Sequence, residues 1–174
     1  MKILLVCIIL VSLFSGCSEA ELKQIENIAN TTHNYGFVTK VVDGDTFWID
    51  YGSSTEKIRV IGVDTPETYA ENKPSKWYGI PESKLDTWGD FATDYAKNTL
   101  EGKSVYIETD PLAGNKDSFG RTLAYVRIDG QDYGLLLLER GYARAYTSET
   151  FLKVVEYVAA ETVARNNRIG IWNN

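Results

Sequence analysis

Three short segments of this chain concentrate carboxylates and arginines. The first is residues 43–46 (Asp-Gly-Asp-Thr), and the second is residues 64–67 (Asp-Thr-Pro-Glu) with Arg59 five residues ahead of it. The third is residues 117–121, Asp-Ser-Phe-Gly-Arg. Each segment alone is ordinary turn chemistry, because Asp-Gly and Thr-Pro pairs are common at turns. Taken together, they form a coherent inventory for one kind of reaction.

The inventory is that of metal-assisted phosphodiester hydrolysis. Asp45 and Asp64 are hard oxygen donors of the kind that Ca²⁺ and Mg²⁺ prefer. Glu67 lies three residues beyond Asp64, after a rigid proline, and can face the same pocket without joining the metal. Arg59 and Arg121 carry planar guanidinium groups that match phosphate oxygens. Such a site can hold a metal ion, a base for water and a clamp for phosphate.

The composition narrows the alternatives. The chain has 174 residues, 44% of them hydrophobic, which indicates one globular domain. A single His and two Cys exclude most zinc and iron–sulfur sites. The net charge is -6, from 18 Lys+Arg and 24 Asp+Glu. This acidic balance argues against coating nucleic acid by bulk charge, so any phosphate site must be local.

The N-terminal segment predicts export and a lipid anchor. Lys2 precedes an apolar run from Ile3 to Phe14, which is too short to span a bilayer and is typical of a signal peptide. Residues 13–17 (Leu-Phe-Ser-Gly-Cys) resemble a bacterial lipobox, which predicts a signal peptide over residues 1–16 and lipidation of Cys17 at the cell envelope. Residues 17–35 then form a polar tether. The alternative is a plain secretory signal cleaved near Gly16.

The remaining residues, 36–174, predict a domain that is mainly β with added helices (α+β). About five strands and three helices fit a five-stranded Greek-key barrel of the OB type with peripheral helices. The expected strands are a hairpin over 36–50, then 57–63, 104–109, 121–128 and 142–146. The expected helices are Gly89 to Leu100, Tyr133 to Arg140 and about Glu149 to Asn166.

Two further expectations concern packing. The last helix has an apolar stripe that predicts its buried face: Phe151, Val154, Val155, Val158, Thr162 and Val163. Residues 69–88 are an irregular loop in this interpretation, and loops of that length are uncommon unless they are functional. Trp77 and Tyr78 either form a flap over single strands, together with neighbouring lysines, or pack onto the barrel.

In this combination the segments resemble those of staphylococcal nuclease and its relatives, the thermonuclease family. The similar stretches are residues 42–46, 59–67, 117–126 and the closing Gly-Ile-Trp at 170–172. Together they extend over about residues 36–172. The resemblance implies an OB barrel with three helices and an enzyme that hydrolyses DNA and RNA with Ca²⁺. We expect a monomer that acts on single-stranded or denatured substrate.

The resemblance also implies a role for each residue of the inventory. Asp45 and Asp64 would bind one Ca²⁺ through their side chains, and Thr65 through its backbone carbonyl. Glu67 would orient or deprotonate the attacking water. The two arginines named above would hold the scissile phosphate and stabilise the charge that grows on its oxygens.

The chain departs from the family pattern at the expected substrate pocket. Where the family usually has Lys-Tyr before Gly-Arg, this chain has Ser118 and Phe119. Phe119 can stack on a base but cannot donate a phenolic hydrogen bond. Tyr146, Lys73 and Lys76 are the further residues that we expect to contact substrate.

Three functions remain open on the sequence. The favoured one is an exported Ca²⁺-dependent nuclease at the cell surface, because every catalytic residue type is present. The alternative is an OB module that binds nucleic acid without cleaving it. The third is a surface lipoprotein in which Asp45 and Asp64 hold a structural Ca²⁺, a role that needs neither arginine.

Overall fold

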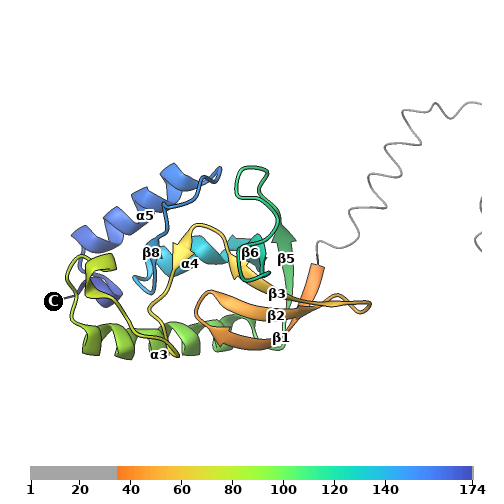
Figure 1. The fold of residues 1–174 in the computed structure, drawn as a ribbon, viewed down its shortest axis with the longest axis horizontal. Helices are drawn as coiled ribbons and strands as arrows, with labels where there is room; N and C mark the ends of the chain where they lie inside the picture. Colours follow the sequence, from red (N-terminus) through yellow and green to blue (C-terminus); the bar gives the residue numbers. More distant parts are fainter. Residues whose placement is uncertain (1–34, 174) are drawn as a thin grey trace, which may run out of the picture. The chain divides into compact units, whose positions relative to one another are not determined.

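Five strands close into a barrel, which confirms the predicted α+β fold of the OB type (Figure 1). This computed structural model describes residues 35–173. The strands are β1 (Tyr35–Asp43), β2 (Thr46–Asp50), β3 (Thr55–Val60), β5 (Ser104–Glu108) and β6 (Thr122–Ile128). Their order is β3-β2-β1-β5-β6, and a parallel pairing of β3 with β6 closes the barrel. The short β7 (Gln131–Asp132) pairs with the end of β6.

The predicted signal peptide, the tether up to residue 34 and Cys17 lie outside the described residues. β1 begins at Tyr35, one residue before the expected start of the domain. Within residues 35–173, no helix is long and apolar enough to cross a membrane.

Alternating side chains place the barrel core. Phe47 and Ile49 of β2 point inward and are fully buried, whereas Trp48 between them faces outward. The β1–β2 hairpin turns at Gly44 and Asp45, because Asp43 pairs with Thr46. The predicted Asp-Gly turn is therefore present, and it carries Asp45 at its tip.

The predicted strand over residues 57–63 is wrong in its length. β3 ends at Val60, and after a turn the short β4 (Val63–Asp64) pairs with β8 (Arg144–Ala145) outside the barrel. Gly62 causes the break, because its φ of +72° is a left-handed conformation that suits glycine. A Cβ atom there would lie 2.5 Å from the ring of Phe151. After the break, Asp64 pairs with Arg144 of β8 and not with a strand of the barrel.

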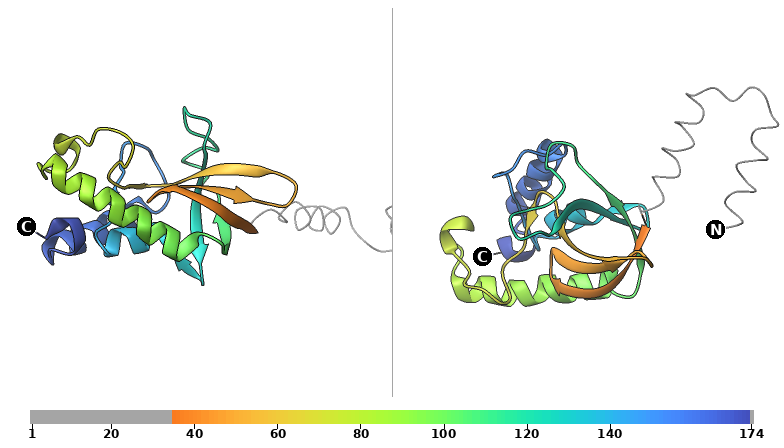
Figure 2. Two further views of the ribbon diagram at one scale, coloured as in Figure 1. Left: turned by 90° about the horizontal axis from the view of Figure 1, so that it is seen from below. Right: turned by 45° about the vertical axis from the view of Figure 1, so that its right-hand side comes forward.

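The first long helix begins earlier than predicted. α3 (Glu82–Leu100) starts directly after Pro81, seven residues before Gly89. Its buried face includes Leu85, Gly89, Ala92, Ala96 and Leu100, which follow helical spacing. Gly89 is therefore an interior position of the helix. Figures 1 and 2 show α3 running along the barrel beside β1.

The remaining helices pack together on another side of the barrel. They are α4 (Tyr133–Glu139) and α5 (Val154–Asn166), so the last helix starts five residues later than predicted. The predicted apolar stripe holds only at its start, where Phe151 is buried and Val154 packs against the core. Val155, Val158, Thr162 and Val163 are exposed, so the rest of the stripe is wrong. The buried face is instead Tyr157, Glu161 and Ala164. The carboxylate of Glu161 accepts a hydrogen bond from the backbone N–H of Ala145, 3.1 Å away, which turns this face toward β8.

The segment before α3 packs one of its aromatic residues into a second small core. Trp77 directly follows the short 3₁₀ helix η1 (Pro74–Lys76). It is buried against Trp172 of the closing 3₁₀ helix η2 (Gly170–Trp172). A flap that uses Trp77 is thus wrong, and the packed alternative holds for this residue. Tyr78 is exposed, with the Arg165 guanidinium 3.7 Å from its ring centre.

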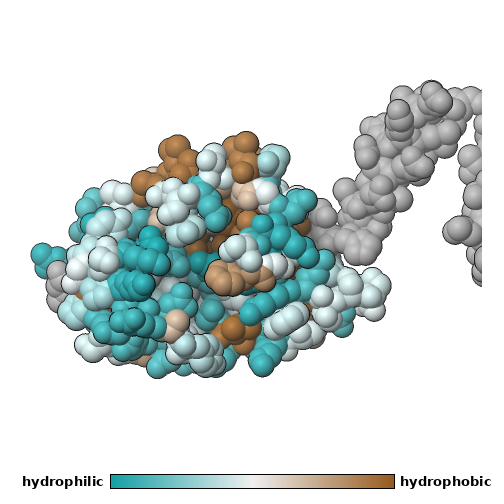
Figure 3. All heavy atoms as spheres, in the orientation of Figure 1, coloured by the Kyte–Doolittle hydropathy of each residue, from teal (hydrophilic) through white to brown (hydrophobic). Residues whose placement is uncertain are grey.

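Most of the surface seen in Figure 3 is hydrophilic. Hydrophobic side chains gather along its upper edge, over the N-terminal end of α5 and the loop before β6. The exposed Leu112, Leu152 and Val155 belong to these segments.

Candidate active site

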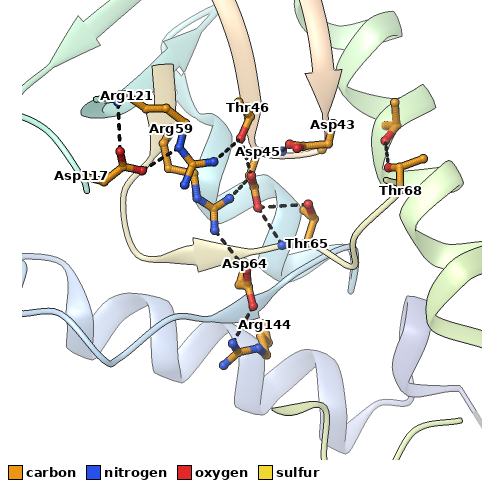
Figure 4. Close-up of polar contacts among 12 residues, drawn as sticks. Asp43, Asp45, Thr46, Arg59, Asp64, Thr65, Thr68, Asp117, Arg121 and Arg144 are labelled. Atoms are coloured by element: carbon orange, nitrogen blue, oxygen red, sulfur yellow. Dashed lines mark hydrogen bonds and ion pairs between the residues drawn. The ribbon is translucent and has the colours of Figure 1, made fainter. Parts of the chain in front are cut away.

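Asp45 is buried at the tip of the β1–β2 turn and is held by four groups. Its Oδ2 accepts hydrogen bonds from the backbone N–H and the hydroxyl of Thr65, at 2.8 and 3.0 Å (Figure 4). Its Oδ1 accepts one from the Thr46 hydroxyl at 3.0 Å and pairs with Arg59. These contacts fix the orientation of the carboxylate and join the hairpin turn to Thr65, the residue that follows β4 (Val63–Asp64).

One guanidinium joins the two aspartates that were predicted to bind metal. Arg59 lies on β3 and contacts Asp45 through Nη1, and its Nη2 lies 3.0 Å from Oδ1 of Asp64 (Figure 4). All three side chains are mostly buried. Because a single planar group reaches both carboxylates, the two converge on the same small volume.

A third arginine, Arg144, pairs with Asp64 and was not predicted. Its Nη2 lies 2.5 Å from Oδ2 of Asp64, its partner in the β4–β8 pairing (Figure 4). The guanidinium carbon lies 5.6 Å from the ring centres of both Trp77 and Tyr146. Arg144 and Tyr146 are two residues apart in the predicted strand 142–146, so they share one side. Because Tyr146 was predicted to contact substrate, this spacing could have identified Arg144 as a residue of the same site.

Arg121 reaches the same region from the loop before β6. Its Nε lies 2.6 Å from Oδ2 of Asp117, and its Nη1 donates to the Thr46 hydroxyl at 3.3 Å. Asp117 also accepts hydrogen bonds from the backbone N–H groups of Phe119 and Arg121. Burial raises the pKa of Asp117, but the hydrogen bonds and charge of Arg121 outweigh it and hold that pKa below its usual range. Asp117 thus stays ionised and orients the arginine.

These elements surround a cleft of about 550 Å³, hereafter the active cleft. It brings together most of the side chains predicted to act on substrate. Those that line it are Arg59, Asp64, Glu67, Lys76, Phe119, Arg121 and Tyr146.

Three predicted residues do not line the active cleft. Asp45 and Thr65 are buried. Asp45 pairs with Arg59, which lines the cleft, and Thr65 directly follows Asp64, which also lines it. Lys73 is exposed and is not among the residues that line the cleft.

The loop that carries Glu67 is fixed by an asparagine. The backbone N–H of Glu67 donates to Oδ1 of Asn72 at 2.8 Å, and Nδ2 of Asn72 donates to the Glu67 carbonyl at 2.9 Å. The same Nδ2 lies 2.9 Å from Oδ1 of Asp86 on α3. Asn72 is buried and was not predicted, because it lies in a segment without periodicity.

The pKa of Glu67 is raised. Burial is the main cause, and the neighbouring carboxylates of Asp64 and Asp43 add to it, while Arg59 and Arg121 oppose it. Burial also raises the pKa of Asp43, against the guanidinium of Arg59. A carboxylate with a raised pKa is a stronger base, which suits proton abstraction from water.

The donor set fits a hard cation. Among residues 35–173, no group of three or more His, Cys, Asp or Glu side chains is placed to hold a metal ion. Asp45 and Asp64 nevertheless converge on one cationic group, the Arg59 guanidinium, and both offer carboxylate oxygens. Oxygen donors without thiolate or imidazole suit Ca²⁺ or Mg²⁺.

Comparisons with known proteins agree with this geometry. Residues 57–174 match the family described as staphylococcal nuclease homologues. An uncharacterized protein of Methanocaldococcus jannaschii is 42% identical over 151 residues, covering 81% of this chain and 72% of the relative. The thermonuclease of Staphylococcus hyicus is 31% identical over 173 residues, covering 99% and 95%. Endonuclease YncB of Bacillus subtilis is 30% identical over 162 residues, covering 88% and 72%. This chain therefore belongs to the staphylococcal nuclease family.

Proposed function

We propose that this protein is a Ca²⁺-dependent nuclease that hydrolyses phosphodiester bonds of DNA, and also of RNA. The observation that carries the proposal is the active cleft, where Glu67 faces the same space as Arg59 and Arg121 beside the Asp45–Asp64 pair. The relatives named thermonuclease and endonuclease support the reaction class.

Asp45, Asp64 and the Thr65 carbonyl are the groups that would hold the ion. When bound, Ca²⁺ supplies a Lewis acid that polarises the phosphate and favours ionisation of water. The aspartates are already oriented for this role by the protein, because Thr65 and Thr46 fix Asp45 and Arg144 fixes Asp64.

The protein side chains divide the chemical step among them. Glu67 accepts a proton from a water whose oxygen attacks phosphorus, and a P–O bond to the leaving nucleotide breaks. The leaving oxygen takes up a proton from solvent water, and Glu67 releases its own proton to solvent after the reaction. Arg59 and Arg121 donate hydrogen bonds to the phosphate oxygens, where negative charge increases in the transition state. Phe119 and Tyr146 offer faces for bases, and Lys76 a cation for a neighbouring phosphate.

The decisive experiment compares cleavage of denatured DNA in Ca²⁺ and in chelator. We expect cleavage only with Ca²⁺, and a loss of about 10²–10⁴-fold in kcat for Glu67→Gln, the usual contribution of a general base. Arg121→Ala should lower the rate by a similar amount because it removes charge stabilisation. Glu71→Gln and Arg127→Ala are matched controls, since Glu71 is an exposed loop carboxylate and Arg127 forms an exposed pair.

The alternative function, binding without cleavage, predicts a different result. The folded wild-type protein would then bind DNA in excess Ca²⁺ and leave it intact. Wild-type rates in both Glu67→Gln and Arg121→Ala would reject the mechanism while leaving the reaction itself in place.

We also propose that the protein is exported and is anchored at the cell envelope by lipid on Cys17, as a monomer. The lipobox-like residues 13–17 support this placement. Cell fractionation should find the wild-type chain with membranes and Cys17→Ala outside them. Equal distribution of both would reject the anchor, and size-exclusion chromatography with light scattering would test the monomer.

A further inference from the structure

We propose that a second hollow next to the active cleft binds the nucleotides that adjoin the scissile phosphate, so the enzyme takes a single-stranded polynucleotide across both. This inference rests on the proposed function and specifies its substrate. The hollow has a volume of about 270 Å³ and lies between the β2–β3 pair and the loop before β6. We call it the strand groove, and its lining includes Trp48, Lys57, Lys116 and Phe119.

The strand groove and the active cleft are neighbours. Lys116, Phe119 and Arg121 line both of them. Arg121 is one of the two arginines assigned to the scissile phosphate. A chain whose phosphate lies at Arg121 therefore has its next nucleotides beside Phe119, at the boundary between the two hollows.

Two exposed aromatic rings, each beside a cation, lie along this route. Phe119 is 83% exposed, with the Arg121 guanidinium carbon 5.4 Å from its ring centre. Trp48 faces outward from β2 and is 38% exposed. Its cross-strand neighbour Lys57 places Nζ 6.0 Å from the indole centre. Aromatic faces with adjacent cations are the general means of binding single strands, because bases stack on the rings and phosphates meet the charges.

The charge in the strand groove favours a polyanion. Lys57 and Lys116 form no ion pair with another described residue, so both charges remain available. Glu56 is the carboxylate among the lining residues, and its Oε2 accepts a hydrogen bond from the Thr122 hydroxyl at 2.7 Å. The groove is thus locally basic in a chain of net charge -6. Local cations of this kind supply affinity for phosphate without bulk attraction.

A similar hollow elsewhere on the barrel provides a matched comparison. It has a volume of about 440 Å³ and also combines exposed aromatic surface with a cation, through Tyr35 and Arg127. It shares no lining residue with the active cleft. An effect that depends on position along the substrate route will therefore appear at Trp48 and not at Tyr35.

The test measures binding of fluorescent oligothymidylates of two and of eight nucleotides by anisotropy, in chelator so that no cleavage occurs. Wild-type protein should bind the longer strand more tightly. Trp48→Ala and Lys57→Ala should each reduce this gain by on the order of ten-fold, the effect of losing one stacked base or one phosphate contact. Both should leave the affinity for the dinucleotide unchanged. Tyr35→Ala and Arg127→Ala should change neither affinity, and Glu56→Gln should strengthen binding of the longer strand.

Substitution by phenylalanine separates stacking from folding. Trp48→Phe keeps an aromatic face and should retain most of the length-dependent gain that Trp48→Ala loses. The proposal is overturned if wild-type protein binds both lengths equally, or if Trp48→Ala and Tyr35→Ala behave alike. Binding of the longer strand through Trp48 without any cleavage in Ca²⁺ would reject the proposed nuclease and keep the strand groove. If the protein cleaves DNA in Ca²⁺ but Trp48→Ala still binds the longer strand as much more tightly as wild type does, the nuclease stands and the strand groove is rejected.

Discussion

At the scale of single residues, the site is notable for how many arginines contact its aspartates. Asp64 receives Arg59 on one carboxylate oxygen and Arg144 on the other. Arg144 also lies beside the rings of Trp77 and Tyr146, so its position does not depend on Asp64 alone. The two guanidinium groups supply positive charge that offsets the repulsion between the neighbouring carboxylates of Asp64 and Asp45.

This arrangement predicts that Arg144 and Ca²⁺ compensate the same negative charge. Replacement by glutamine leaves Asp64 less neutralised, so Arg144→Gln should lower the free energy of unfolding in chelator by about 2 kcal/mol, since breaking a mostly buried ion pair is costly. The variant should gain more stability from added Ca²⁺ than wild type does, because the ion replaces the lost charge. Urea unfolding with and without Ca²⁺ measures both effects.

Arg127→Gln is the control for this prediction. Arg127 pairs with Glu108, and both side chains are more than one third exposed, so its loss should change stability little and leave the response to Ca²⁺ as in wild type. An equal Ca²⁺-dependent gain in Arg144→Gln and wild type would show that Arg144 and the ion act on separate charges.

The residues found from the sequence and those missed differ in one respect. Asp64, Glu67 and the other motif residues stand in short segments whose combination is informative without any knowledge of the fold. Arg144 and Asn72 act through contacts that depend on the fold: Arg144 contacts Asp64, 80 residues away, and Asn72 joins the nearby backbone of Glu67 to Asp86 of α3. A single arginine or asparagine carries no such information until strand pairing and loop path are known.

At the scale of elements, α3 supports the loop that carries Glu67. Gly89 lies where the helix meets this loop, and a Cβ atom there would lie 2.8 Å from the Glu67 carbonyl oxygen and 3.0 Å from that of Pro66. Backbone atoms cannot move aside as a flexible side chain can. The side chain of Asn72 also holds this stretch, through hydrogen bonds to the backbone N–H and carbonyl of Glu67.

This contact predicts that Gly89→Ala impairs catalysis more than it impairs folding. Alanine favours a helix interior by roughly 1 kcal/mol over glycine, which offsets part of the steric cost in stability. The loop must shift by a few tenths of an ångström, and displacement of a catalytic group by that order lowers rates strongly. We expect kcat to fall by on the order of ten-fold or more, while thermal unfolding changes little. Asp90→Ala, an exposed neighbour on α3, should keep the wild-type kcat.

If Gly89→Ala retained the wild-type kcat, the close packing of helix and loop would have no part in placing Glu67. If it lost stability and activity together, the contact would serve the fold and not the site alone.

The elements that were predicted less well also have physical reasons. Residues 57–63 are rich in β-branched residues and predict one strand, but Gly62 takes a positive φ, and a Cβ atom there would lie 2.5 Å from the ring of Phe151. The valines of α5 follow helical spacing, yet the helix turns Tyr157 and Glu161 inward because Glu161 satisfies the backbone of β8. Tertiary contacts decided both cases.

At the scale of the whole molecule, one buried carboxylate connects three parts of the chain. Asp110 follows β5 and is almost completely buried. Its Oδ2 accepts hydrogen bonds from the Tyr125 hydroxyl of β6 and from the backbone N–H of Leu152 ahead of α5, at 2.5 and 2.7 Å. Its Oδ1 accepts one from Leu112 at 2.7 Å. The barrel and the entry to the last helix therefore depend on one ionised group.

This network predicts how stability depends on acid. Burial raises the pKa of Asp110, but the hydrogen bonds from Tyr125, Leu152 and Leu112 outweigh it and hold the pKa below its ordinary value. A lowered pKa in the folded state means that Asp110 contributes stability above its unfolded pKa, and this stability is lost as the pH falls through the folded value.

At neutral pH, Asp110→Asn should lower the free energy of unfolding by about 2 kcal/mol, because hydrogen bonds to a charged acceptor are lost. The difference from wild type should shrink on acidification, since wild type then loses the same charge, and urea unfolding from pH 7 to pH 3 measures it. Asp94 forms an exposed ion pair with Lys97 on α3, so Asp94→Asn should change the free energy of unfolding little at any pH. A cost for Asp110→Asn that stays constant with pH would show that the network depends on shape and not on charge.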